Sequence, residues 1–272
     1  MKKIGDNMKN ILFLVLCVVL LGFGGTASPD TKKLYNNGTI KVAVIDTGFD
    51  FESTWPKHKF DKWVINRSFF GPSPQHIQKP RLCNEGHKDF TGEGLSDRHG
   101  HGTHIAGIIG KHARNSNYCL VIIKYYSQGE DGSVNLKREI QAFQYALNIK
   151  VDIINFSGGG PSPSYKEHEI VKKLLARGTK LVFAAGNENE NIDIPENKYY
   201  PASYSPKIFT VGSYKRNLTR ARTSNYGKSV NYWEIGDNVL SLLPGDRIGY
   251  MGGTSQATAV KTGKIIKSWV HN

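Results

Sequence analysis

Three histidines lie within six residues of one another in the stretch DRHGHGTHIAG, at positions 97–107. They are His99, His101 and His104. Histidine is the side chain best suited to act as a base near neutral pH, and it is also a common zinc ligand. A zinc site needs three or four ligands, and beyond residue 27 the chain offers only Cys83 and Cys119 as thiolates, which form no CxxC pair. The cluster is therefore a metal site, a charged loop, or one working base with two bystanders, and its spacing alone does not decide between these.

Three other motifs place polar side chains where apolar runs end. Asp46 ends the run in VIDTG, Asn187 follows VFAAG, and Ser255 follows two glycines in GGTSQATAV. Together with a histidine they supply an orienting carboxylate, an oxyanion donor, a nucleophile and a base, which is the set that nucleophilic acyl transfer needs. Each motif alone is typical of a turn or a strand end. Their joint order, Asp before His before Ser, is one of the known orders of a Ser-His-Asp triad.

The elements that hold these residues alternate between strands and helices. Five short runs are apolar on both faces, as strands of a parallel sheet are, at residues 40–45, 119–126, 151–155, 180–185 and 207–212. Residues 135–150 repeat apolar positions at helical spacing, and a second helix is expected between the capping pair Ser164 and Glu167 and the stop at Gly178. This alternation predicts one α/β domain with a doubly wound, mostly parallel sheet and helices on both faces. Chemistry in such sheets gathers at the carboxyl ends of the strands, where the motifs lie.

The first 27 residues have the three parts of a secretory signal peptide: a basic start, thirteen apolar residues and the small residues GTAS. Thirteen apolar residues are fewer than the ~20 that usually span a bilayer. We therefore expect a leader at 1–27, a folded domain at 28–272, and an exported protein, secreted or periplasmic, without stable membrane insertion after cleavage. An uncleaved leader that anchors the chain is the minor alternative. Export would permit a Cys83–Cys119 disulfide, with two free thiols as the alternative.

The formal net charge of the chain is +13. Such a charge favours anionic surfaces and acidic substrates. The basic residues are scattered, however, whereas a nucleic-acid site would group them with aromatic residues on one element. We therefore expect a solvated basic surface and no nucleic-acid partner.

With these motifs in their order, the chain resembles the subtilisin-like serine proteases, or subtilases, over roughly residues 39–261. The resemblance extends to the stretches between motifs, such as VDIINFSGGG and YYPASYSPKIFTVGS. It implies that Asp46 is the triad aspartate, that Ser255 is the nucleophile and that Asn187 donates to the oxyanion. The substrate backbone would pair along the strand edge at Ser157, Gly158 and Gly159.

The resemblance also separates the three histidines. The family's helix motif is HGTH, and its first histidine is the base, so the resemblance implies this role for His101. His104, one turn further on, would be structural, and His99 would lie on the approach loop. The family chemistry requires no cofactor, and the resemblance implies no metal in the catalytic site.

The chain departs from the family pattern at several places. After Ser255 it reads SQATA where SMASP is usual, so the helix there lacks its common early proline. The chain ends seventeen residues after Ser255, which predicts a C-terminally shortened version of the fold. Too few residues separate the leader from the first strand for the family's large pro-domain, and GKHARNSNY is short for its calcium-binding loop. An inhibitor or pro-domain supplied in trans stays an open question.

The sequence thus predicts an exported serine endopeptidase that hydrolyses protein or peptide substrates through an acyl-enzyme intermediate. The first alternative is a catalytically inactive, subtilase-like interaction or regulatory protein, and the second is a basic binding module for an anionic surface. Acidic residues crowd the loop after Asn187, and they predict a preference for Lys or Arg before the scissile bond unless the loop is merely solvated. They are Glu188, Glu190, Asp193 and Glu196.

Overall fold

The computed structural model describes residues 38–54, 77 and 79–269. The chain divides into two units, Met1–Gly38 and Thr39–Asn272, and the fold below is that of the second unit. The predicted signal peptide at 1–27 lies outside the described residues, as do residues 55–76 and 78. Among the helices that are described, none has the length and apolar character needed to cross a bilayer.

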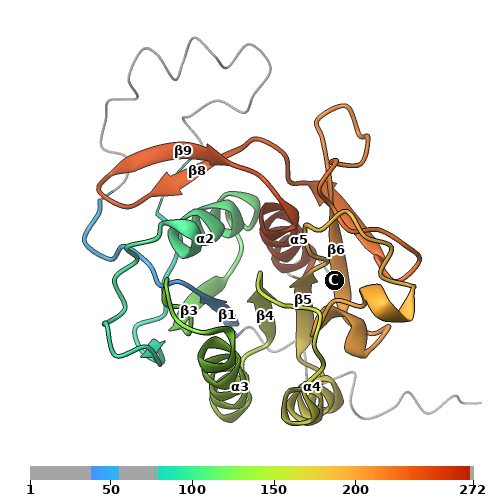
Figure 1. Cartoon of the computed structure of the whole chain (residues 1–272). Helices are drawn as coiled ribbons and strands as arrows, with labels where there is room; N and C mark the ends of the chain where they lie inside the picture. The colour runs from blue at the N-terminus through green and yellow to red at the C-terminus, as the bar shows by residue number, and fades with distance from the viewer. Residues whose placement is uncertain (1–37, 55–76, 78, 270–272) are drawn as a thin grey trace, which may run out of the picture. The chain divides into compact units, whose positions relative to one another are not determined.

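Seven strands form one sheet in the order β2-β3-β1-β4-β5-β6-β7, and each neighbouring pair is parallel (Figure 1). The five predicted strands all form, with ends shifted by no more than two residues. The strands are β1 (Ile40–Asp46), β2 (Lys88–Asp89), β3 (Tyr118–Lys124), β4 (Ile153–Phe156), β5 (Lys180–Ala184), β6 (Phe209–Tyr214) and β7 (Tyr232–Ile235).

Helices cover both faces of this sheet (Figure 1). One face packs against α2 (His101–His112) and α5 (Thr254–Trp269), and the other against α3 (Gly132–Asn148) and α4 (Tyr165–Arg177). Strand β1 serves both cores, because successive side chains of a strand point to opposite faces. Its Val42 and Val44 belong to the first core and its Ala43 and Ile45 to the second. The predicted doubly wound α/β fold is confirmed.

Local signals account for where the helices begin and end. The hydroxyl of Ser164 accepts a hydrogen bond from the backbone N–H of Glu167 at 3.4 Å, as its capping spacing predicts. Gly178 ends the same helix in the left-handed conformation, with φ of 90°. Helix α5 begins at Thr254 and forms without the early proline that is usual in the family.

A hairpin that the sequence analysis did not identify packs along α2. It consists of β8 (Val239–Leu243) and β9 (Arg247–Met251), which pair antiparallel and lie over that helix (Figure 1). Two short 3₁₀ helices, η3 (Pro195–Asn197) and η4 (Ala202–Tyr204), lie between β5 and β6.

Cys83 and Cys119 form a disulfide, with their Cα atoms 4.8 Å apart. The bond joins the segment before β2 to strand β3, beside the backbone hydrogen bond from Cys83 to Leu120. The predicted pairing of these two cysteines is confirmed.

Candidate functional site

The polar side chains singled out from the sequence come together at the carboxyl edge of the sheet. Asp46 is the last residue of β1, and Asn187 follows β5 by three residues. His101 and Ser255 lie instead in the first turns of helices α2 and α5. These two helices lie side by side on one face of the sheet, so their N-terminal ends reach the same edge (Figure 1).

Asp46 and His101 are in direct contact. Nδ1 of His101 lies 2.7 Å from Oδ1 of Asp46, whose carboxylate is 4% exposed. The carboxylate also accepts the backbone N–H of Thr47 at 2.8 Å. Because an ionised carboxylate only accepts hydrogen bonds, Nδ1 must carry the proton. Nε2 of a neutral ring is then the nitrogen that can accept a proton.

The surroundings of His101 act on its pKa in opposite directions. Burial lowers the pKa, while the negative charge of Asp46, the hydrogen bond to it and the more distant charge of Asp97 raise it, and the net shift is upward. A raised pKa favours the imidazolium form, which is the form a base takes after it has received a proton.

Asp97 fixes the loop that enters α2, and the sequence analysis did not assign it a role. Its carboxylate is 2% exposed and accepts hydrogen bonds from the hydroxyl of Thr47 at 2.9 Å and from the backbone N–H groups of Gly100 at 2.7 Å and Thr103 at 2.8 Å. It thereby satisfies donors at the start of α2 and ties them to the end of β1. An aspartate a few residues before the first helical residue is the available sequence signal.

Asn187 is oriented by the start of α5. Its amide oxygen accepts the backbone N–H of Thr254 at 2.9 Å and the hydroxyl of the same residue at 3.2 Å. A backbone N–H can only donate, so the atom facing it must be the amide oxygen. The Nδ2 group is then the part of Asn187 that is left to donate to a ligand.

Ser255 is 8% exposed and lies in the first turn of α5, where backbone N–H groups have no partner within the helix. Its hydroxyl donates to the carbonyl of Ser157 at 3.5 Å. No hydrogen bond links it to His101 within the described part of the chain. Such catalytic hydrogen bonds are often long without substrate and tighten when substrate binds.

The subtilase family model matches residues 37–269, which is most of the chain. The chain belongs to the subtilase family. It is 34% identical over 247 residues to the major intracellular serine protease of Bacillus subtilis (strain 168), covering 85% of this chain and 69% of that one. It is 29% identical over 234 residues to subtilisin E of the same organism, covering 82% and 54%. The chain therefore spans roughly half to two thirds of the length of these relatives.

Solved subtilase structures share the fold. A cold-adapted subtilisin-like serine proteinase superposes with a TM-score of 0.66 at 23% identity, covering 86% of this chain and 76% of that one. A lanthipeptide protease superposes with a TM-score of 0.64 at 19% identity, covering 82% and 72%. The predicted subtilisin-like architecture is confirmed, and the chain is a subtilisin-like serine protease by family.

Of the three histidines in this subtilase, only His101 contacts the carboxylate of Asp46. Nε2 of His104 lies 3.1 Å from the carbonyls of both Val239 and Gly249, so it joins α2 to the β8–β9 hairpin. Burial lowers the pKa of His104 to about 4, which keeps its ring neutral. His99 is exposed, with its ring 6.2 Å from that of His101. Within the described residues, no three His, Cys, Asp or Glu side chains are grouped to hold a metal ion.

The predicted substrate edge, Ser157 to Gly159, directly follows β4. Beyond it, Gly160 pairs antiparallel with Tyr200 through hydrogen bonds of 2.9 and 2.8 Å. This pairing holds the segment that follows the acidic loop against the end of the edge.

The carboxylates of the acidic loop bind groups of their own domain. Glu188 accepts the side-chain amide of Asn225 at 2.7 Å, and Glu190 accepts that of Asn197 at 2.8 Å. Asp193 accepts the backbone N–H groups of residues 228 and 229. These contacts favour a structural role for the loop over the predicted binding of Lys or Arg side chains.

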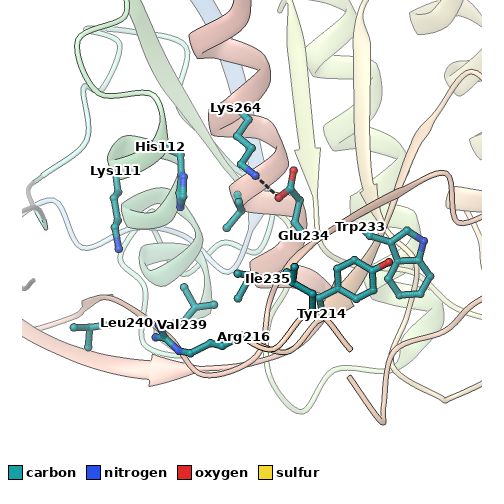
Figure 2. A pocket seen from close by; sticks show the side chains of 12 residues that line it. Lys111, His112, Tyr214, Arg216, Trp233, Glu234, Ile235, Val239, Leu240 and Lys264 are labelled. Atoms are coloured by element: carbon teal, nitrogen blue, oxygen red, sulfur yellow. Dashed lines mark hydrogen bonds and ion pairs between the residues drawn. The ribbon is translucent and has the colours of Figure 1, made fainter. Parts of the chain in front are cut away.

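A cavity of about 450 Å³ lies away from these residues, between the end of α2, strands β6 and β7, and helix α5 (Figure 2). Lys111 and His112 line it from α2, and an ion pair of 2.5 Å between Lys264 and Glu234 joins α5 to β7 there. None of the residues predicted for the chemistry lines this cavity.

Proposed function

We propose that this subtilase is a serine endopeptidase in which Ser255 is the nucleophile, His101 the general base and Asp46 the residue that orients the base. The single observation that carries the proposal is the 2.7 Å contact between Asp46 Oδ1 and His101 Nδ1, on the helix packed beside the one that carries Ser255. It supports a neutral imidazole with Nε2 ready to accept a proton, which is what a serine nucleophile requires.

In the proposed first step, the Ser255 oxygen attacks the carbonyl carbon of the scissile peptide bond and its proton moves to Nε2 of His101. The imidazolium that forms is stabilised by the carboxylate of Asp46. The same proton is then given to the leaving amine, and the carbon–nitrogen bond breaks to leave an ester on Ser255. Water then attacks the ester carbon and its proton moves to Nε2 of His101. His101 gives this proton to the Ser255 oxygen as the ester bond breaks, and the acid is released.

The negative charge of each tetrahedral intermediate needs donors placed before the reaction starts. The Nδ2 group of Asn187 and the backbone N–H of Ser255 are our candidates. The hydrogen bonds from Thr254 to the amide oxygen of Asn187 support this assignment, because they fix the amide in one orientation. A preorganised donor costs no reorganisation when the charge develops.

Substrates in this proposal are proteins or peptides that lie extended along the edge formed by Ser157, Gly158 and Gly159. Ser157 supports this placement, because its carbonyl is the partner of the Ser255 hydroxyl and so adjoins the reacting oxygen. A substrate backbone beside these residues would have its carbonyl within reach of the nucleophile.

We further propose that residues 1–27 are a leader removed on export, and that 28–272 form the peptidase domain. The disulfide between Cys83 and Cys119 supports an oxidising compartment, because such bonds are rare in the cytosol. Two relatives are named as intracellular proteases, so export is a property to test in this chain itself.

A non-catalytic relative is the second candidate. It is favoured by the hydroxyl of Ser255, which donates to the carbonyl of Ser157 and not to the imidazole. An inactive interaction protein would keep the fold without tightening this contact when a substrate binds.

Hydrolysis of a denatured protein by single variants tests the proposal. Ser255→Ala and His101→Ala should each lower turnover by on the order of 10⁶-fold, because the two side chains act as a unit. His99→Ala is the matched control, since it removes an exposed imidazole two residues away and should leave turnover nearly unchanged. Loss of activity in His99→Ala with retention in His101→Ala would show that the base is assigned wrongly.

A further inference from the structure

The aromatic ring of Tyr199 lies between the two segments that flank Ser255. A Cβ atom placed on Gly159 would come within 2.5 Å of Cε1 of Tyr199, and one placed on Gly186 within 2.9 Å of Cδ2 of the same ring. These carbons lie at opposite edges of the ring. Tyr199 therefore bridges the gap from the edge after β4 to the loop after β5.

The two glycines make room for this ring. Gly159 has φ of 149° and Gly186 has φ of 96°, and neither carries a Cβ atom that would collide with it. The backbone around Tyr199 is fixed as well, because its N–H donates to the hydroxyl of Ser203 at 3.2 Å and the next residue pairs with Gly160. The ring is thus part of a closed wall.

The location of this wall has a consequence for a bound substrate, which rests on the proposed function. Strands β4 and β5 are parallel neighbours, so the segments that follow them lie on either side of one gap. An extended peptide along Ser157 to Gly159, with its scissile carbonyl held by Ser255 and Asn187, has alternating side chains. The side chain just before the scissile bond would point into the gap between these segments, where the Tyr199 ring lies.

The Tyr199 ring itself carries no charge that would attract a basic side chain. Burial, followed by the negative charges of Glu188 and Glu139, raises the pKa of Tyr199 above its ordinary value of 10, so its hydroxyl stays neutral. The carboxylate of Glu188 accepts the amide of Asn225. The ring therefore adds an apolar surface to the gap, and the Glu188 carboxylate beside it is held by Asn225.

We propose that Tyr199 is a specificity-determining residue, which fills the pocket for the residue before the scissile bond and restricts that residue to Gly, Ala or Ser.

A peptide library that varies the residue before the scissile bond tests this with three proteins: the wild type, Tyr199→Ala and Tyr199→Phe. The wild type should have a kcat/KM at least ~10-fold higher for Ala than for Phe or Leu at that position. Tyr199→Ala should raise kcat/KM for Phe and Leu by on the order of 10–100-fold, which is the discrimination an apolar pocket can supply. Tyr199→Phe keeps the ring and should keep the preference for small residues.

Labelling of Ser255 by a fluorophosphonate distinguishes a failure of the inference about Tyr199 from a failure of the proposed function. If the wild type is labelled but prefers Phe, Leu, Lys or Arg, the inference about Tyr199 is overturned and the proposed function stands. The same holds if Tyr199→Ala is labelled at the wild-type rate with an unchanged profile. If the wild type is not labelled at all, the proposed function fails, and this inference with it. A Tyr199→Ala protein that does not fold leaves the wild-type profile to decide.

Discussion

Glu139 is a carboxyl group buried in the core between α3 and α4, and replacing it with Gln should stabilise the protein at neutral pH. Glu139 is 6% exposed and shares a hydrogen bond with Glu167, which in turn accepts the hydroxyl of Tyr204 at 2.7 Å. Burial, then the hydrogen bond and the charge of Glu167, raise the pKa of Glu139 well above its ordinary value of 4.5. One oxygen of Glu139, Oε1, has no hydrogen-bond partner within the described residues.

The sign of the effect follows from proton counting. Above pH 4.5 the unfolded chain releases the proton of Glu139 while the folded protein keeps it, so the folded state binds more protons and its stability falls as pH rises. The loss is ~1.4 kcal/mol for each pH unit until the folded-state pKa is passed. Gln carries a permanent donor in place of that proton and does not titrate. The stability of Glu139→Gln minus that of the wild type should therefore grow by up to ~2.7 kcal/mol between pH 5 and pH 7.

Urea unfolding at several pH values measures this difference, with all variants made in a Ser255→Ala background to prevent self-digestion. Glu130→Gln is the matched control, because Glu130 lies just before α3 with its side chain 42% exposed. The control should change the free energy of unfolding only slightly, because an exposed side chain outside the core is replaced. A Glu139→Gln protein that is less stable than its parent at pH 7, or a difference that does not vary with pH, would refute the account of this buried pair.

Three further predictions concern the site and the disulfide. Activity should rise with pH through a midpoint above ~6.5, because the raised pKa of His101 keeps the base protonated below it; a pH–rate profile with a midpoint well below that value would contradict this. Asn187→Ala should lower kcat by about 100- to 1000-fold with little change in KM, as removal of such a donor does in subtilisin. A variant with a raised KM and an unchanged kcat would argue against an oxyanion role. Reducing the Cys83–Cys119 bond, which spans 36 residues, should lower the free energy of unfolding by roughly 3–4 kcal/mol, and unfolding curves that coincide with and without reductant would refute it.

The sequence carries most of the fold because its signals are local. Apolar runs mark the strands, and a capping pair with a terminal glycine marks α4, so both can be read from neighbouring residues. The β8–β9 hairpin is not among the predicted elements, although apolar residues flank PGD in VLSLLPGDRIGYM, a recognisable turn signal. Its packing against α2 through His104 joins residues more than 130 positions apart, which periodicity does not reveal.

The order of the motifs along the chain predicts part of the site. Asp46 and His101 meet as expected, whereas the role of Asp97 depends on donors from two different elements. The position of Tyr199 depends on two glycines that are 40 and 13 residues before it, so it could be found only from the folded structure.

Reaction of Ser255 with a fluorophosphonate tests the central claim most directly, because only an activated serine reacts quickly with this reagent. The full chain should take up one phosphonate group, located on the peptide that contains Ser255, at a rate that rises with pH as His101 loses its proton. His101→Ala should suppress the reaction, and His99→Ala should leave it unchanged. A wild-type protein that is folded but takes up no label, or that carries the label on another residue, would contradict the assignment of Ser255 as the nucleophile.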